Sequence, residues 1–217
     1  SLCLSAYGRT LLTVSKNRST CVQVWYTTTW KEQRRFEGHT MTVSSVEFLP
    51  GERYIVSGGG DGRIILWDRQ TGREVTRVEN LGHLANSVLP VLDGDHLVSF
   101  GGWYDDDAPN PMENDHAIRL WQLPEYVRAT EPQIPEQDDI ELERTLPPLG
   151  GKIDAIDVSA DGKLLLAADN AGNLRLWETA GFDPMGTWRV HDSVRDAQFT
   201  SDAKRIVTCG RSGEPRA

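Results

Sequence analysis

Residues 38–68 read GHTMTVSSVEFLPGERYIVSGGGDGRIILWD and contain the pattern from which the fold is predicted. Apolar and polar side chains alternate near its start, as they do in a half-buried strand, and Pro-Gly-Glu then marks a turn. The run from Gly58 to Gly62 indicates a tight hairpin, because Gly and Asp tolerate the positive φ of such turns. A strand follows this hairpin at residues 64–67, and one more strand follows the turn at residues 70–72. The unit is predicted to have four antiparallel strands, at residues 43–48, 54–57, 64–67 and 74–78.

The same unit recurs along the chain. Four of the seven tryptophans share one setting, in Val24-Trp25, Leu66-Trp67, Leu120-Trp121 and Leu176-Trp177, and they lie 42, 54 and 56 residues apart. A period near 40–45 residues is typical of propeller blades, so the two longer spacings contain insertions. No segment shows a helical period. The predicted fold is therefore all-β, a β-propeller of four-stranded antiparallel blades.

The turns divide the chain into successive blades. The last unit reaches Ala217 where its Trp-bearing strand is expected, so we expect about four and a half blades of an incomplete propeller. An open end would leave a strand edge and an apolar blade face available for pairing with another chain. Whether the chain is a fragment of a longer protein, with a truncated last blade, is left open, as are the total number of blades and the oligomeric state. The blades are predicted at approximately residues 1–36, 37–80, 81–146, 147–190 and 191–217.

The chain resembles the WD-repeat β-propeller family in two pairs of dipeptides. Gly38-His39 precedes Trp67-Asp68, and Gly82-His83 precedes Trp121-Gln122. The resemblance implies about seven blades in a complete ring. It also implies a hydrogen-bonded chain of His, Ser or Thr, Asp and Trp inside each blade. Such groups satisfy one another when buried, which favours a structural role over a catalytic triad. The matching residues are His39, Ser57, Asp61 and Trp67 in one blade and His83, Ser99, Asp115 and Trp121 in the next.

The fourth blade departs from this pattern. Gly150-Gly151 stands in place of Gly-His, and Ala167 and Ala171 fall where Ser57 and Asp61 lie in the second blade. We therefore expect no polar network there and a reliance on apolar packing.

Composition limits the possible partners. The chain has a net charge of −9 and a pI near 5.0, the wrong sign for binding nucleic acid or an anionic membrane surface. No apolar run approaches the 18 or so residues of a membrane helix. The three cysteines are too few for a disulfide scaffold, which favours a cytoplasmic setting.

A long insertion in the third blade, residues 102–115, is a candidate binding loop. Its aromatic residues would serve as interface anchors, and its carboxylates would select a basic partner. Two alternatives stay open: a tolerated surface insertion, or a cation held by Asp105, Asp106, Asp107, Glu113 or His116. The candidate partner contacts, all expected on the face that carries the Gly-His loops, are Thr40, Met41, Trp103, Tyr104 and Arg211.

No nucleophile with a base, carboxylate pair or metal-ligand cluster supports catalysis in this sequence. We therefore expect a non-enzymatic scaffold without cofactors that binds proteins or peptides through its propeller loops. The alternative is a sensor or regulatory propeller within a larger enzyme, such as a kinase or a nucleotide-driven switch, with catalysis outside this chain. The identity of the partner and the pathway stay open.

Overall fold

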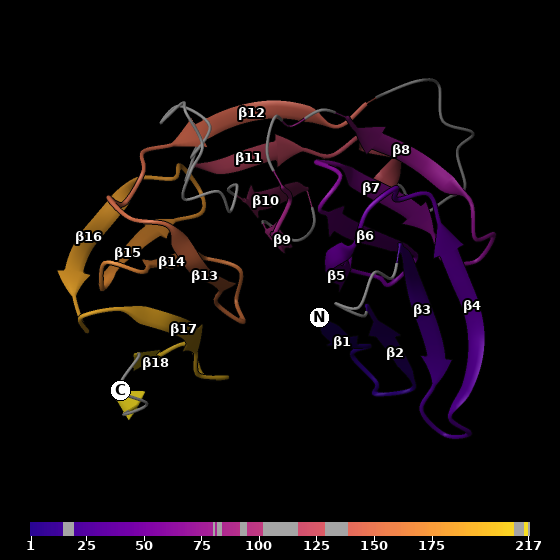
Figure 1. The fold of residues 1–217 in the computed structure, drawn as a ribbon, viewed down its shortest axis with the longest axis horizontal. Helices are drawn as coiled ribbons and strands as arrows, with labels where there is room; N and C mark the ends of the chain where they lie inside the picture. The colour runs from indigo at the N-terminus through magenta and orange to yellow at the C-terminus, as the bar shows by residue number, and fades with distance from the viewer. Residues whose placement is uncertain are drawn as a thin grey trace. The chain divides into compact units, whose positions relative to one another are not determined.

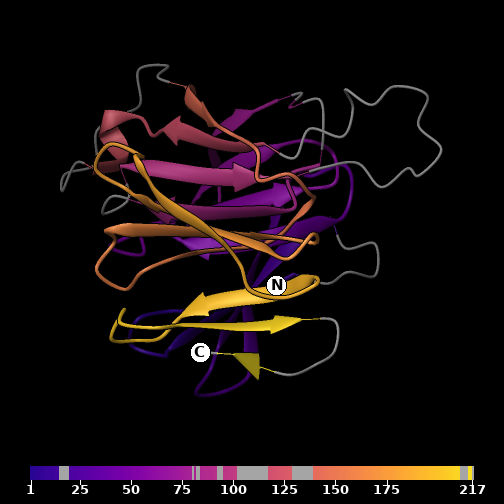
Figure 2. The same ribbon diagram turned by 90° about the vertical axis from the view of Figure 1, so that its left-hand side faces the viewer.

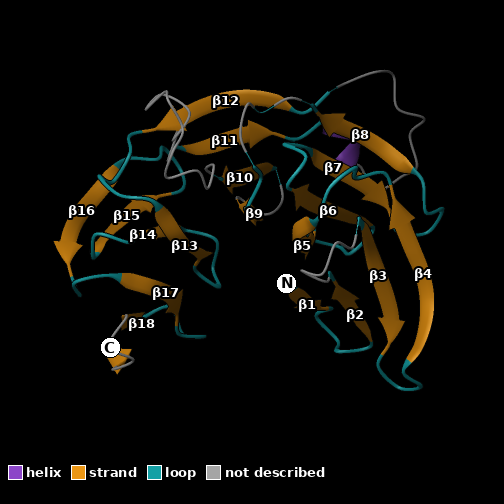
Figure 3. Ribbon diagram, viewed as in Figure 1, coloured by secondary structure: helices purple, strands orange, loops and turns teal. Residues whose placement is uncertain are grey.

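The computed structural model describes residues 1–14, 20–79, 81, 84–91, 95–101, 117–128, 139–210 and 215–216. Strands make up almost all regular structure in these ranges, and the short helix α1 (Glu125–Arg128) is the exception (Figure 3). The all-β class predicted from the sequence is confirmed. No helix in the described ranges has both the length and the apolar character needed to cross a membrane.

The strands form five sheets, and in each sheet the strands are joined in chain order. The unit quoted from the sequence forms its four strands where they were predicted, with small extensions of the second and third. The first sheet contains β1 (Leu2–Leu4), β2 (Thr10–Thr13), β3 (Cys21–Tyr26) and β4 (Lys31–Glu37), and the second contains β5 (Val43–Phe48), β6 (Tyr54–Gly59), β7 (Ile64–Asp68) and β8 (Glu74–Val78). The third contains β9 (Ser87–Val91), β10 (His96–Phe100), β11 (Ile118–Gln122) and β12 (Glu141–Leu146), and the fourth contains β13 (Ile153–Val158), β14 (Leu164–Asp169), β15 (Asn173–Glu178) and β16 (Pro184–Arg189). The fifth contains β17 (Val194–Phe199), β18 (Ile206–Gly210) and β19 (Pro215–Arg216).

The chain divides into two compact units. The first contains the sheets β1–β4 and β5–β8 and most of β9–β12 (Figure 1). The second contains the sheets β13–β16 and β17–β19, drawn in orange and yellow in Figure 2. The division of the chain into blades at the boundaries given above stays a prediction.

The core of the first unit lies between successive sheets. Between the first and second sheets, Trp67 packs on Phe36 with ring centroids 5.6 Å apart and an interplanar angle of 45°. Between the second and third sheets, Trp121 lies in a similar cluster. The other members of the two clusters include Leu12, Val22, Val24 and Ile55 in the first and Ile64, Leu66, Val88 and Leu97 in the second, all essentially without solvent exposure.

In the second unit, β13 and β14 contact β17. Their small apolar core contains Ala155, Leu166, Leu174 and Val194. The Asp157 carboxylate accepts a hydrogen bond of 2.7 Å from the Phe199 N–H and so links the two sheets. Burial raises the pKa of Asp157 above its ordinary value.

Candidate functional site

Four side chains form a hydrogen-bonded quartet inside the second sheet. The Nδ1 of His39 lies 2.9 Å from Oδ1 of Asp61, and its Nε2 lies 2.8 Å from the Oγ of Ser57. The indole Nε1 of Trp67 donates to the same Oγ at 2.9 Å. The His39 and Asp61 side chains are only 1% and 3% exposed, so each depends on these partners for hydrogen bonding.

With a neutral imidazole, elementary hydrogen-bond chemistry sets the direction of every bond in the quartet. An indole N–H only donates and a carboxylate only accepts. Ser57 therefore accepts from Trp67 and donates its O–H to Nε2 of His39, and the Nδ1–H of His39 donates to Asp61. One neutral imidazole tautomer satisfies all four groups, and the Ser57 hydroxyl is wholly buried. This arrangement is suited to fixing strand geometry.

The pKa values of the two titratable members agree with that assignment. Burial lowers the pKa of His39 below its ordinary value, and the hydrogen bond to Asp61 only partly opposes the effect. Burial raises the pKa of Asp61, but hydrogen bonds from His39 and from the N–H groups of Thr40 and Arg63 outweigh it, so the net pKa is below the usual value. The quartet therefore holds a neutral imidazole beside a carboxylate.

Acidification is expected to weaken the fold through His39. Its pKa in the folded state lies below the ordinary value of 6.5, so below about pH 6.5 the unfolded chain binds more protons than the folded chain. The contribution of His39 to the free energy of unfolding is therefore complete above that pH and decreases as the pH falls through it. Urea unfolding at several pH values between 8 and 5.5 measures this decrease in the free energy of unfolding. A His39→Gln chain should show a weaker pH dependence, and an unaltered dependence would contradict the assignment.

The quartet also fixes the loop between β4 and β5. Asp61 Oδ2 accepts the N–H of Thr40 at 2.8 Å, and the N–H of Gly60 donates to the carbonyl of Thr42 at 2.8 Å. Thr40 is exposed, and Met41 beside it is 56% exposed. Two of the residues predicted as partner contacts are thus exposed side by side on a loop that hydrogen bonds to Asp61 and within the hairpin hold in place.

The other predicted contacts, Trp103, Tyr104 and Arg211, lie outside the described residues. The same is true of the candidate cation ligands, which are Asp105, Asp106, Asp107, Glu113 and His116. Within the described residues, no three His, Cys, Asp or Glu side chains converge as a metal site would require.

Parts of the same quartet recur in other sheets. Trp121 Nε1 donates to Ser99 Oγ at 2.8 Å, while the two predicted partners His83 and Asp115 lie outside the described residues. In the first sheet the indole of Trp25 donates to Thr13 at 3.0 Å. In the last sheet His191 Nε2 lies 3.0 Å from Thr208 Oγ1. A hydroxyl on the second strand is the shared element.

The expectation that the fourth sheet has no polar network is wrong, although its strands also pack through apolar residues. The wholly buried Asp169 accepts the N–H groups of Gly151, Ala171 and Asn173 at 2.8–3.0 Å and the Asn173 side-chain amide at 2.8 Å. In the strand register Asp169 holds the position of Gly59, since Ile153 faces Asp169 as Val43 faces Gly59. Gly151 replaces the histidine of the second sheet and has no side chain. The carboxylate of Asp169 lies two residues before Ala171, the position that corresponds to Asp61, and it accepts the hydrogen bonds in this sheet.

Three exposed aromatic residues lie near the turns at the other end of the first sheet, and none of them was predicted as a contact. Tyr7 is 87% exposed in the turn from β1 to β2, Tyr26 is 43% exposed at the end of β3, and Trp30 is 68% exposed in the turn from β3 to β4. Thr27 Oγ1 donates to the Gly8 carbonyl at 2.6 Å and joins the two turns. In the sequence Tyr26 and Trp30 flank a run of threonines, and this pattern could have indicated an exposed aromatic turn.

The Cys3 thiol is not available as a nucleophile. It donates to Glu47 Oε2 at 2.9 Å, and burial, together with the nearby Glu47 carboxylate, raises its pKa to about 12. A thiol with that pKa stays protonated at neutral pH and is unreactive.

Comparison with known proteins connects this architecture to a repeat family. The model described as "WD domain, G-beta repeat" matches residues 30–68. The chain is 28% identical over 179 residues to the small ribosomal subunit protein RACK1y of Oryza sativa subsp. japonica, covering 80% of this chain and 45% of that protein. It is 25% identical over 218 residues to eukaryotic translation initiation factor 3 subunit I of Candida glabrata, covering 94% and 56%.

A third relative is the target of rapamycin complex subunit LST8 of Saccharomyces cerevisiae, 27% identical over 183 residues, which cover 80% of this chain and 51% of that protein. The chain spans about half the length of these curated relatives. The family match falls on the segment that builds the buried quartet and the loop of Thr40 and Met41. This chain therefore contains a repeat of the WD, G-beta type, and its predicted resemblance to the WD-repeat family is confirmed.

Proposed function

We propose that this chain is a non-catalytic scaffold that binds proteins or peptides through the loops at its strand ends. One observation carries the proposal: Thr40 and Met41 are exposed on a loop that the buried Asp61 holds in place. Fixing a contact loop before binding lowers the conformational entropy that association costs. Methionine is also well suited to binding surfaces, because its flexible thioether adapts to different partners.

The relatives support the class of function. By name they are a small ribosomal subunit protein, a subunit of a translation initiation factor and a subunit of a target of rapamycin complex, all components of multiprotein assemblies. We extend this to the present chain as a proposal, with a cytoplasmic location. The net charge of −9 favours a basic partner. Trp103, Tyr104 and Arg211 remain proposed contacts.

A second binding surface is favoured by the aromatic residues at the other end of the first sheet. Tyr and Trp are enriched among the residues that dominate binding energy at protein interfaces. Tyr7, Tyr26 and Trp30 are exposed near two turns that a hydrogen bond joins. We propose that these residues form a second, independent contact with partner proteins.

Charge substitution of Met41 tests the loop surface. In affinity capture from the native host with quantitative mass spectrometry, Met41→Glu is expected to lower the recovery of specific partners at least about tenfold, because a carboxylate replaces an apolar anchor. Met185→Glu is the matched control, since Met185 is 53% exposed in another sheet. Equal recovery by the two variants, with circular dichroism melts like that of the parent chain, would contradict the proposed site.

A further inference from the structure

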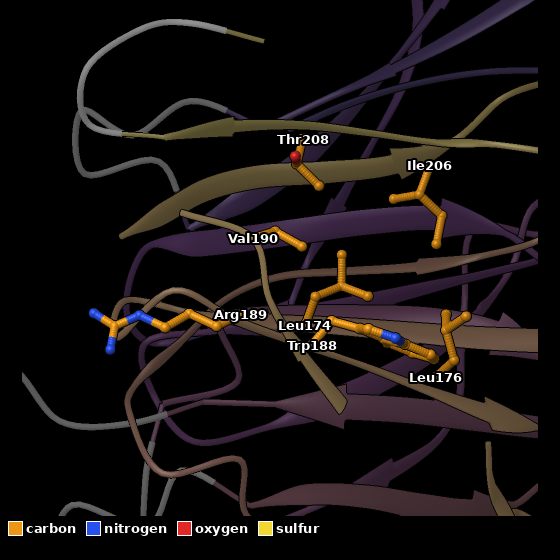
Figure 4. A pocket seen from close by; sticks show the side chains of 7 residues that line it. All are labelled: Leu174, Leu176, Trp188, Arg189, Val190, Ile206 and Thr208. Carbon is orange, nitrogen blue, oxygen red and sulfur yellow. The ribbon is translucent and has the colours of Figure 1, made fainter. Parts of the chain in front are cut away.

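Exposed aromatic side chains have different surroundings in the two units. In the second unit Trp188 lies with Leu174 and Leu176 along a largely apolar groove of about 490 Å³ (Figure 4). In the first unit Tyr7 and Trp30 lie on turns and are 87% and 68% exposed. Cationic side chains surround these two residues, so charge as well as apolar contact can select what binds there.

Four turns of the first two sheets, at the end opposite the loop of Thr40 and Met41, are rich in cations. They are the turns at residues 5–9, 27–31, 49–53 and 68–73. Together they contain five cationic and two acidic residues, although the whole chain has a net charge of −9. The net charge of these turns is therefore opposite in sign to that of the chain.

Each carboxylate in these turns or directly beside them already lies in an ion pair. The pairs are Glu52 with Arg69, Asp68 with Arg53, Glu32 with Arg35 and Glu74 with Arg77. Three cations of the turns remain, which are exposed and have no ion-pair partner among the described residues. They are Arg9, Lys31 and Arg73. Their charges are available to a ligand.

Hydrogen bonds join the turns of the two sheets into one surface. The Arg69 guanidinium donates to Thr10 Oγ1 at 2.7 Å and so connects the turn between β7 and β8 to the start of β2. The Arg34 guanidinium donates to the Thr71 carbonyl at 2.8 Å and connects β4 to the same turn. A surface that is fixed before binding loses less conformational entropy on association.

Arg9 and Lys31 are close enough to contact one ligand segment. The N–H of Thr27 donates to the Arg9 carbonyl at 3.1 Å, and Lys31 faces Tyr26 across β3 and β4. Since neighbouring strands lie about 4.8 Å apart, the backbones of Arg9 and Lys31 are roughly 10 Å apart. Three residues of an extended chain span about the same distance.

The corresponding turn of the fourth sheet contains a carboxylate that the first sheet lacks. In the turn between β1 and β2 and in the turn between β13 and β14, the N–H of a glycine donates to the carbonyl three residues earlier at 2.8 Å. By this match Arg9 corresponds to Lys163, and Tyr7 corresponds to Asp161. Lys163 lies 3.8 Å from the Asp161 carboxylate. Because Tyr7 replaces that carboxylate, Arg9 keeps its charge and has an exposed aromatic ring two residues away.

The backbone at Trp30 also favours a role in binding. Trp30 has a φ of 52°, in the left-handed region that is unfavourable for a bulky residue. By strand register the corresponding residues are Gly72, with a φ of 79°, and Phe182, with a φ of 54°. Phe182 is buried, so packing offsets its strain, whereas the indole of Trp30 is exposed. Strained residues are concentrated at functional sites.

We propose that these four turns bind an acidic, extended segment of a partner protein. Carboxylates of the segment pair with Arg9, Lys31 and Arg73, and apolar side chains between them contact Tyr7 and Trp30. Exposed charges more than about 8 Å apart are largely screened at physiological ionic strength, so the local cations select the ligand and not the net charge of the chain. The proposal rests on the second contact surface of the proposed function and adds the chemistry of its ligand.

A rhodamine-labelled peptide of three Asp-Glu-Leu repeats is the probe, and its binding is followed by fluorescence anisotropy. The 217-residue chain is expected to bind it saturably at physiological ionic strength, and more weakly as NaCl is added. The uncharged peptide of three Asn-Gln-Leu repeats, with the same label, is expected to bind at least about tenfold more weakly. Equal binding of the two peptides, or no binding of the acidic peptide, would overturn the proposal. Tighter binding of a labelled RNA oligonucleotide would also overturn it, because the ligand would then be a nucleic acid.

Charge reversal locates the binding. Arg9→Glu and Lys31→Glu are each expected to weaken binding of the acidic peptide at least about tenfold, because each replaces an attraction with a repulsion. Both side chains are exposed, so the fold tolerates the change. Lys163→Glu is the matched control, since Lys163 has the position of Arg9 in the fourth sheet, and it should leave binding unchanged. If Arg9→Glu and Lys31→Glu bind as the parent chain does, the assignment is wrong.

Trp30→Gly separates binding from folding. Glycine adopts the left-handed conformation without strain, so this variant is expected to unfold at the urea concentration of the parent chain or at a higher one. Its binding of the acidic peptide should nevertheless be about tenfold weaker, because the indole is lost. Unchanged peptide binding by Trp30→Gly would contradict the part assigned to the indole.

Failure of this inference is distinguishable from failure of the proposed function. Met41→Glu should leave binding of the acidic peptide unchanged, because the loop of Thr40 and Met41 lies at the other end of the sheets. If Trp30→Gly loses partners in affinity capture while the acidic peptide does not bind, the second contact surface stands and its acidic ligand is wrong.

Discussion

Replacing Trp67 with Ala is expected to lower the free energy of unfolding by about 3–5 kcal/mol, the usual range for removing a large buried aromatic side chain. Trp67 is 2% exposed and packs on Phe36 with the two rings tilted. The substitution also takes the donor from Ser57, and Ser57 in turn holds His39. Loss of packing and loss of a buried hydrogen bond therefore act together.

Two comparisons separate these contributions in urea unfolding experiments. Trp67→Phe retains an aromatic ring but not the N–H, so a smaller loss of stability is expected. Trp30→Ala, at a tryptophan that is 68% exposed, should change the free energy of unfolding by no more than about 0.5 kcal/mol. If Trp67→Ala costs no more than Trp30→Ala, the cluster between the first two sheets does not have the role assigned to it.

Replacing Asp169 with Ala is expected to cost about 3 kcal/mol or more. Its carboxylate satisfies three backbone N–H groups and one side-chain amide, and each buried donor left without a partner costs roughly 1–3 kcal/mol. Asp161 provides a matched control in the turn before β14, because its exposed carboxylate also accepts from a backbone N–H, that of Lys163.

The comparison of these two aspartates is decisive for the fourth sheet. Asp161→Ala is expected to lower the free energy of unfolding by about 1 kcal/mol or less, since water replaces the lost partner. Both values come from urea unfolding followed by circular dichroism. Equal losses for Asp161→Ala and Asp169→Ala would mean that apolar packing, and not the buried carboxylate, supports this sheet.

Local patterns in the sequence were sufficient to predict the strands of the second sheet, whereas the members of its quartet were implied by the resemblance to the WD-repeat family. Alternation and turn residues are properties of neighbouring positions, and the dipeptides Gly38-His39 and Trp67-Asp68 mark both ends of the unit. Asp169 could not be found in this way. It sits in the register position of Gly59, and only strand pairing shows that a carboxylate there reaches the space left by Gly151.

The exposure of Tyr7 and Trp30 was also beyond the sequence, because it depends on how the turns of the first sheet are held together.

The measurement that tests the scaffold role most directly is site-specific photo-cross-linking. A photoreactive amino acid replaces Met41 in one chain and the similarly exposed Met185 in a control chain, and both are irradiated in extracts of the native host. We expect defined protein adducts at position 41 that are absent from the control. Identical adduct patterns at the two positions, or none at position 41, would contradict the claim that this loop binds partner proteins.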